Sequence, residues 1–485
     1  MKKLLVFILS LTLLVALAAC ATDDPVPADP GNGETPEVSD EPADDPADDG
    51  DEPEEPPAGD LPIIGTGAIT YDPNIPVNNG EEITITLWTW AYVEWIEEAM
   101  DAYMAIHPNV TVDIVITPWS DYFTRLPVAL HAGTGPDIFM PHIQYTSILR
   151  PNMAPYSLGG ISNEDLLTDF RTAGNHISDG EIYWIDQGII MSAIIYNKDM
   201  WADAGLTDDD IPITWDELIE VAQLLTEFND NGDIEVQGFS PNGAVFDLWK
   251  DLVLQQGHFL FNAEGTAPHI NTPAGIAASQ LIYDMYYVHE IADIRFPEGW
   301  QALGNNDAAM IYSFSWLFPL LDYMFPDLNY GYFNMPAFTE DVPPAFGRLS
   351  GEASLGVPAI ADPEVQAVAF DIVRFTLAND ELLIRYNLLQ RNVPTKFTIE
   401  NDPRLLADDM IAGQLSIIER ILYVGDIPAA YQHALPRFVE EAILLNREPI
   451  ADVLETAQEV ITRDMVGQEF YSLERHYRFA DEMSD

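Results

Sequence analysis

Cysteine is almost absent from this chain, whose 485 residues contain a single one, Cys20. One cysteine excludes an intramolecular disulfide and any zinc or iron–sulfur site built from cysteines. Basic residues are also scarce, with 20 lysines and arginines against 80 acids and a net charge of −60. Because such a surface repels phosphate backbones, the composition argues against nucleic-acid binding.

Apolar material, in contrast, is plentiful. Hydrophobic residues make up 47% of the chain and aromatic residues 11%, which is enough to build a large packed core and excludes disorder of the whole chain. The length corresponds to about three domain-sized units.

The first twenty residues have the pattern of a secretory leader. Lys2 and Lys3 precede a 16-residue apolar run, 4–19, which is short for a membrane span. The run ends in Leu-Ala-Ala-Cys at 17–20, which resembles a bacterial lipobox. We therefore predict a lipoprotein signal peptide over 1–20, with a lipid on Cys20 that holds the mature chain on a membrane outside the cytoplasm.

Residues 21–60 form a second distinct segment. They include sixteen acids and nine prolines but no lysine or arginine. Such a composition cannot bury enough apolar surface to fold. We predict a disordered acidic stalk over 21–60, followed by one folded domain over 61–485.

The folded part begins with a strand–helix–strand pattern. Apolar and polar residues alternate over 83–87 and again over 110–116, and between them apolar residues recur at helical spacing over 96–103. A further helical stretch near 122–130 leads to a short buried-strand pattern at 137–140. This alternation predicts an α/β fold with a parallel sheet.

A second unit of the same kind follows. A long apolar run covers 189–196, and Thr214 with Glu217 forms a capping-box signature that opens a helix.

Several segments match, in order and spacing, a known family over roughly 82–470. They are 85–90 (ITLWTW), 107–112 (HPNVTV), 133–139 (GTGPDIF), 195–199 (IYNKD), 213–218 (ITWDEL), 307–310 (DAAM) with Ser315-Trp316, and 368–377 (VAFDIVRFTL). The chain resembles the family-1 extracellular solute-binding proteins, the maltose-binding-like receptors of ATP-binding-cassette (ABC) importers.

The resemblance implies two α/β lobes of discontinuous segments with a hinged ligand cleft between them. We place the first lobe at about 82–190 and 300–345 and the second at about 191–299 and 346–485, with crossings near 183–194 and 334–354. It also implies a monomeric, cofactor-free receptor at the extracellular face of the cell membrane that delivers a carbohydrate to transmembrane permease subunits.

Sugars present apolar CH faces ringed by hydroxyls, so their sites combine aromatic platforms with hydrogen-bonding side chains. Residues after strands that face the cleft are placed to supply both. The predicted ligand contacts are Trp90, Tyr92, Gln144, Tyr145, Asp186, Gln187, Phe246, Asp247, Trp316, Glu352 and Tyr431. Core packing is the alternative role for at least one of Phe246, Asp247 and Trp249, and hinge hydrogen bonding is the alternative for Asp186.

Other functions remain open at this point. A secreted glycoside hydrolase would use paired carboxylates, but no catalytic motif, metal-binding motif or phosphate loop is recognisable in the chain. A receptor of the same fold for a peptide or polyamine is the other alternative, and the excess of acids is compatible with a cationic ligand.

Overall fold

The computed structural model describes residues 60–338, 342–425, 427–445, 447–467 and 472–485. The predicted leader (1–20) and all but the last residue of the predicted stalk (21–60) lie outside these ranges. Within them, no helix combines the length and the apolar character needed to span a bilayer.

The main elements alternate between strands and helices through the first part of the chain and become richer in helix towards its end. The strands are β1 (Ile83–Thr89), β2 (Val110–Ile116), β3 (Ile138–Phe139), β4 (Ile177–Ser178), β5 (Glu181–Ile182), β6 (Gly188–Asn197), β7 (Glu227–Phe228), β8 (Ile234–Val236), β9 (Met310–Phe314), β10 (Tyr330–Asn334), β11 (Gly347–Glu352), β12 (Val393–Pro394) and β13 (Ile421–Leu422). The longer helices are α2 (Val93–Ile106), α3 (Trp119–Ala132), α5 (Asn163–Asp169), α7 (Trp215–Leu225), α8 (Val245–Gln255), α9 (Pro273–Tyr287), α11 (Leu317–Met324), α12 (Pro363–Ala378), α13 (Asp380–Gln390), α15 (Asp409–Ile417), α16 (Ala429–Glu440) and α17 (Ile450–Met465), with shorter helices α4 (Thr146–Leu149), α6 (Lys198–Asp203), α10 (Gly299–Gly304) and α14 (Pro403–Leu406).

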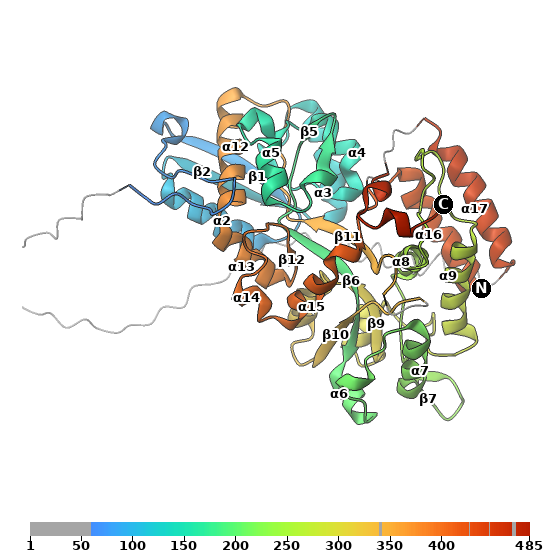
Figure 1. Cartoon of the computed structure of the whole chain (residues 1–485). Helices are drawn as coiled ribbons and strands as arrows, with labels where there is room; N and C mark the ends of the chain where they lie inside the picture. Colours follow the sequence, from blue (N-terminus) through green and yellow to red (C-terminus); the bar gives the residue numbers. More distant parts are fainter. Residues whose placement is uncertain (1–59, 339–341, 426, 446, 468–471) are drawn as a thin grey trace, which may run out of the picture. The chain divides into compact units, whose positions relative to one another are not determined.

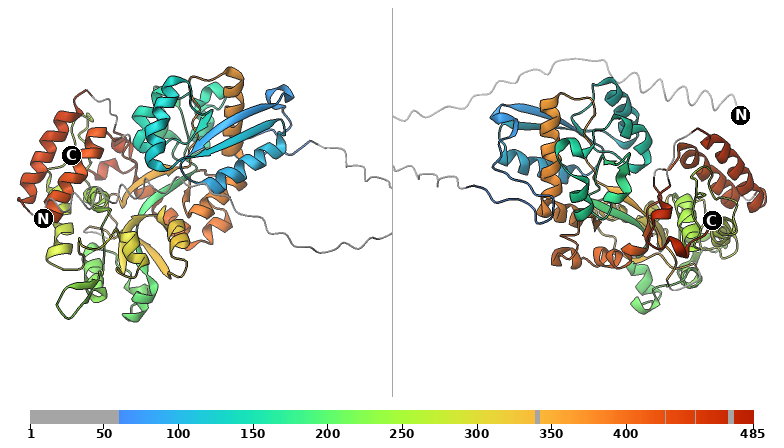
Figure 2. Two further views of the ribbon diagram at one scale, coloured as in Figure 1. Left: turned by 180° about the vertical axis from the view of Figure 1, so that it is seen from behind. Right: turned by 45° about the horizontal axis from the view of Figure 1, so that its top comes forward.

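The predicted strand–helix–strand unit is present and forms a parallel sheet. Its strand order is β2-β1-β3, with Leu87 opposite both Ile114 and Ile138. Helix α12 contacts β1 and α2, and the views in Figures 1 and 2 show it lying along this sheet. The carboxyl ends of β1 and β3 therefore meet at one edge of the sheet.

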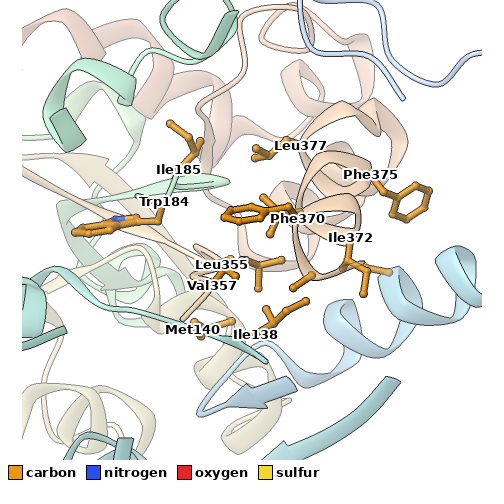
Figure 3. Close-up of a cluster of buried hydrophobic side chains, with 14 of the residues drawn as sticks. Ile138, Met140, Trp184, Ile185, Leu355, Val357, Phe370, Ile372, Phe375 and Leu377 are labelled. Atoms are coloured by element: carbon orange, nitrogen blue, oxygen red, sulfur yellow. The ribbon is translucent and has the colours of Figure 1, made fainter. Parts of the chain in front are cut away.

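The first hydrophobic core joins two distant stretches of the sequence. Figure 3 shows Ile138 and Met140 beside Leu355 and Val357, with Phe370 of α12 close by. The cluster extends from Ile69 to Ile185 and resumes from Ala353 to Ile411. We call the residues packed around this cluster the first lobe.

Strand β6 connects the first lobe to the second. All ten of its residues are buried, as expected for the apolar run at 189–196. Its first half pairs with β11 and β12, and its second half pairs with β9 and β10. The second core begins at Ile194, reaches Ala345 and resumes at Leu422. We call the residues around it the second lobe, and they include α16 and α17, which lie side by side in Figure 1.

The predicted crossings at 183–194 and 334–354 coincide with these changes of core, but the assignment of segments to lobes was wrong. Residues 300–345 belong to the second lobe, because β9 and β10 pair with the second half of β6. Residues 353–411 belong to the first lobe, because α12 packs there. A third crossing between Ile411 and Leu422, which the sequence analysis did not predict, returns the chain to the second lobe.

Candidate ligand-binding cleft

A cavity of about 820 Å³ lies between the two lobes, within the usual size range of small-molecule sites. Its walls come from both lobes and from the strands that connect them. The first lobe supplies Trp90, Ala91, Tyr92, Trp119, His142, Ile143, Gln144, Glu352 and Gln390; the connecting strands β6 and β11 supply Ile190, Leu349 and Ser350; the second lobe supplies Asp247, Lys250, Phe314, Trp316, Pro319, Leu320, Tyr323, Arg348, Gly425, Ile427 and Gln432.

The wall from the first lobe is aromatic. Trp90 follows β1 and His142 follows β3, so the parallel sheet brings them to the same edge. Trp119 packs edge-on against both rings, with centroids 4.6 Å from Trp90 and 4.8 Å from His142. The indole N–H of Trp90 is buried and finds no partner among the described residues, so it has a donor to offer.

Glu352, at the end of β11, joins the connecting strand to this aromatic wall. Tyr92 donates a hydrogen bond to Oε2 of Glu352 at 2.7 Å, Ser350 donates to Oε1 at 3.4 Å, and Nε2 of His142 lies 3.6 Å from Oε1. Burial, and then the charge of Glu352, raises the pKa of Tyr92 well above its usual value. The Tyr92 hydroxyl therefore remains a donor at any physiological pH.

The backbone is strained on both sides of this hydrogen bond. Tyr92 and Ala353 both have φ = 57°, in the left-handed region that non-glycine residues rarely adopt. Such conformations cost about 1–3 kcal/mol each and are retained where the surrounding structure imposes them, commonly at ligand sites. The two strained residues therefore indicate that the surrounding structure holds the Tyr92–Glu352 hydrogen bond in place in the wall of the cleft.

The wall from the second lobe carries paired charges. Oδ1 of Asp247 lies 2.8 Å from Nζ of Lys250 and 2.7 Å from Nη2 of Arg348. Arg348 also pairs with the buried Asp251 at 3.1 Å, and Tyr312 donates to Oδ2 of Asp251 at 2.6 Å. Within the described residues, Oδ2 of Asp247 has no hydrogen bond, and the side chain is 36% exposed. This oxygen is free to accept hydrogen bonds from a ligand.

The ionisation of this cluster follows from its packing. Partial burial on its own would raise the pKa of Asp247, but the charges of Lys250 and Arg348 outweigh it and lower that pKa to about 2. Burial, reinforced by the charge of Arg348, lowers the pKa of Lys250 to about 8 in spite of Asp247. At neutral pH the second-lobe wall therefore contains the cations Lys250 and Arg348 together with the ionised Asp247. Burial raises the pKa of the neighbouring Asp251.

Six of the eleven predicted contacts line the cavity. They are Trp90, Tyr92, Gln144, Asp247, Trp316 and Glu352. The other five, Tyr145, Asp186, Gln187, Phe246 and Tyr431, do not, and their places in the fold explain why.

The three aromatic residues among these five pack inside the lobes. Tyr145 stacks on Phe123, with parallel rings 4.0 Å apart. Tyr431 is fully buried against Phe261, and Phe246 lies under the ammonium group of Lys250 at 3.9 Å. Phe246 therefore takes the core role that was the alternative for its segment.

Asp186 and Gln187 lie at the first crossing between the lobes. They form hydrogen bonds within this crossing and do not line the cavity. Asp186 accepts from Ser354 at 2.9 Å and lies 2.5 Å from Nε2 of His176. This is the alternative role predicted for Asp186. Gly351 is required here because a Cβ at this position would overlap the Asp186 carboxylate. The backbone N–H of Gln187 donates to the carbonyl of Glu352 at 2.9 Å.

The sequence analysis missed several lining residues, chiefly Trp119, Lys250, Arg348 and Tyr323. Lys250 carried a signal that was available, since it is one of only three lysines after residue 60. The sequence signal for Arg348 was weaker: it lies four residues before the predicted contact Glu352.

A model of the bacterial extracellular solute-binding proteins matches residues 90–375, which is more than half of the chain. The chain belongs to this family. The predicted resemblance is confirmed, and so is the extracellular solute-binding class.

Among curated relatives, the chain is 26% identical over 220 residues to the arabinooligosaccharide-binding protein of Halalkalibacterium halodurans, covering 43% of this chain and 47% of the relative. It is 24% identical over 194 residues to the lactose-binding protein of Rhizobium radiobacter, covering 38% and 44%. The matched region thus spans about half the length of each relative.

Solved structures show the same fold at low identity. The cyclic α-maltosyl-1,6-maltose binding protein of Arthrobacter globiformis aligns with a TM-score of 0.66 at 19% identity over 79% of this chain and 99% of its own. The maltose/maltodextrin-binding domain of Bdellovibrio bacteriovorus, bound to maltotriose, gives 0.67 at 17% over 79% and 100%. The predicted two-lobed α/β fold is therefore confirmed.

Proposed function

We propose that this chain is the substrate-binding subunit of an ABC importer and that it binds a neutral oligosaccharide between its two lobes. The observation that carries the proposal is the composition of the cleft. Aromatic side chains from both lobes face hydrogen-bonding groups, and among these the charge of Asp247 is already paired with Lys250 and Arg348.

The aromatic groups suit the apolar faces of sugar rings. Trp90, Tyr92 and Trp119 lie on one wall, and Phe314 and Trp316 on the other. A flat ring stacked on such a side chain buries its CH groups while its hydroxyls point to the edges.

The hydrogen-bonding groups at those edges are of both kinds. Oδ2 of Asp247 and the carboxylate of Glu352 accept, while the ammonium of Lys250 and the indole N–H of Trp90 donate. Hydroxyls act as donors and acceptors at once, so a ligand rich in hydroxyls satisfies all of these groups.

The pairing of charges argues against the charged ligands that the acidic composition left open. Lys250 and Arg348 neutralise Asp247, and Glu352 is hydrogen-bonded to Tyr92. A polyamine would leave the two cations of the cleft facing its own charge, which is costly in a partly dry site. The ligands named for the relatives and structural neighbours, among them arabinooligosaccharide, lactose and maltotriose, also support a sugar.

The ionisation of Asp247 bears on the alternative of a glycoside hydrolase. A glycosidase needs one carboxylic acid that is protonated near neutral pH. The pKa of Asp247 is lowered to about 2 by Lys250 and Arg348 against the effect of burial, so this group cannot act as that acid. Members of the family are substrate-binding proteins, and we propose the same non-enzymatic role here.

The N-terminal segments of the chain suggest how the receptor is held at the cell surface. We propose that a lipid on Cys20 anchors the mature chain to the outer face of the cell membrane, that the acidic segment 21–60 is its stalk, and that the receptor acts as a monomer that passes its ligand to permease subunits. The lipobox-like 17–20 and the composition of 21–60 support the anchor and the stalk.

Thermal unfolding of the folded part in the presence of a carbohydrate panel tests the proposal. The panel contains mono- to hexasaccharide series of glucose, arabinose and mannose, together with lactose and, as a cationic comparison, spermidine. A ligand at 100 times its Kd stabilises the protein by about 2.7 kcal/mol. Stabilisation by spermidine alone, or release of shorter sugars during incubation, would contradict the proposal.

A further inference from the structure

A second, smaller cavity of about 200 Å³ lies on the face of the connecting strands opposite the ligand-binding cleft. Successive residues of a strand point to opposite faces. On β6, Ile190 lines the cleft and Ile189 lines the second cavity, while Leu349 of β11 contacts both. Ile189 and Leu349 pack with Ile421 and form the apolar side of this cavity. We call it the rear pocket.

Both lobes contribute polar residues to the rear pocket. Arg171 and Thr172 line it from the first lobe, where they lie between two members of the first core. Arg478 lines it from the last segment of the chain. The backbone N–H of Leu473 donates to the carbonyl of Val424 at 3.0 Å, and this hydrogen bond ties the last segment to the second lobe. A ligand in the rear pocket would therefore touch both lobes.

The charge of the rear pocket differs from that of the chain as a whole. Two arginines, Arg171 and Arg478, line it together with one acid, Glu419, whereas the chain has 80 acids and only 20 lysines and arginines. Arg478 pairs with Glu419, and Nη2 of Arg171 lies 2.5 Å from Oε2 of Glu400. A guanidinium group has five N–H donors, so a single carboxylate cannot occupy all of them.

Two buried polar atoms of the residues in this wall have no hydrogen-bond partner within the described residues. They are Nε of Arg171 and Oγ1 of Thr172. The side chain of Arg171 is only 12% exposed, and Thr172 is 1% exposed. A buried polar group without a partner is costly, and in a native structure it calls for a bound water or ion. Arginine can only donate and a threonine hydroxyl can donate as well, so a ligand made of acceptors satisfies both side chains.

We propose that the rear pocket binds a small oxyanion, of the phosphate or carboxylate type. Its volume is below the range of about 300–1,000 Å³ that drug-sized ligands need, so the ligand is small. Oxyanions are rich in acceptors, and the planar fork of a guanidinium group binds two of their oxygens at once. The site lies across β6 from the sugar cleft and goes beyond the proposed function, on which it does not depend.

Titration calorimetry of the intact protein tests the site with two probes, inorganic phosphate and acetate, which separate a phosphate site from a carboxylate site. Sodium chloride at the same ionic strength is the reference. We expect saturable binding of one of the two oxyanions at one site per chain. Binding of neither oxyanion above the chloride reference would overturn the proposal.

Two variants place this binding in the rear pocket. Thr172→Val keeps the shape of the side chain but removes its hydroxyl, so we expect a Kd about 10-fold weaker. Arg478→Gln removes an exposed charge and should weaken binding about 2- to 5-fold. Arg463→Gln is the matched control, because Arg463 has the same 69% side-chain exposure as Arg478, also pairs with an acid, and does not line the rear pocket.

The outcomes separate a site from a general effect of charge. Binding that neither Thr172→Val nor Arg478→Gln weakens, or that Arg463→Gln weakens as much as Arg478→Gln, overturns the rear pocket as an anion site. Because Oγ1 of Thr172 has no protein partner among the described residues, Thr172→Val should melt at or above the wild-type temperature without oxyanion. If its Tm is lower, the comparison of Arg478→Gln with Arg463→Gln decides. Sugar binding in the cleft is measured separately, so failure here leaves the proposed function in place.

Discussion

Replacing Trp316 with alanine removes the most exposed indole that lines the cavity, and it tests whether stacking on this ring contributes to ligand binding. Trp316 is 43% exposed and lines the cavity at the start of α11. Since it is not buried, its loss should leave folding nearly intact, with a change in unfolding free energy within about 0.5 kcal/mol, as for other surface substitutions.

The magnitude of the binding effect follows from the exposed area. A tryptophan side chain offers up to about 250 Å², so 43% exposure leaves roughly 100 Å² open to the cleft. A sugar ring on one face covers about half of that, and about 50 Å² at about 25 cal/mol per Å² gives about 1.3 kcal/mol. This energy corresponds to a Kd about tenfold weaker.

Titration calorimetry and thermal unfolding on the same preparation give both quantities. Phe228→Ala, at a residue that is 49% exposed against 43% for Trp316 and lies outside the cleft, controls for the general effect of removing a surface aromatic residue. A variant that is destabilised by several kcal/mol yet binds normally would refute the reasoning, because it would show that Trp316 contributes to packing and not to the ligand.

Three further predictions concern charge and anchoring. Asp247→Asn leaves Lys250 and Arg348 without their shared carboxylate, so we expect calorimetry to show ligand binding weakened by about 1.5–3 kcal/mol, the range for a charge-assisted hydrogen bond; unchanged affinity would remove Asp247 from the site. Burial raises the pKa of the Glu474 carboxyl from 4.5 to about 7. Between these pH values the folded protein keeps a proton that the unfolded chain has lost. The contribution of this group to the free energy of unfolding is therefore complete below about pH 4.5 and falls as the pH rises to about 7. Glu474→Gln should abolish this component, which amounts to about 3 kcal/mol in denaturant titrations at pH 4.5 and 7; equal pH dependence in both proteins would contradict it. Cys20→Ser should release the protein from the membrane fraction or leave it unprocessed, without altering the ligand affinity of the folded part, and a correctly trimmed variant that stays on the membrane would argue against the lipid anchor.

The sequence was sufficient for features that depend on neighbours along the chain. Alternation over 83–87 and 110–116 and helical spacing over 96–103 predicted β1, β2 and α2, because burial of one face imposes its period on the residues of each element. The capping box of Thr214 and Glu217 likewise begins α7 where it was expected. The position of Trp90 and Tyr92 just after a strand predicted that they would face the cleft, and both line the cavity.

The tertiary structure alone decided which distant segments meet. Nothing local distinguishes 353–411 as part of the first lobe, and the assignment depends on α12 packing beside β1 about 280 positions earlier. Asp186 likewise is a residue type that could bind a ligand, but the side chains of His176 and Ser354, from two other segments, contact its carboxylate instead.

The charged wall of the cleft shows the same division. The sequence by itself determined that lysine would be rare, and the family resemblance predicted Asp247 as a ligand contact, a residue that the structure places in the wall of the cavity. Only the folded structure brings Arg348 on β11 to within 2.7 Å of Asp247 on α8, where its charge adds to that of Lys250 in lowering the pKa of Asp247. The physical reason is that an element's period reflects its own burial, whereas an ion pair between two elements depends on how the strands and helices of the whole lobe pack.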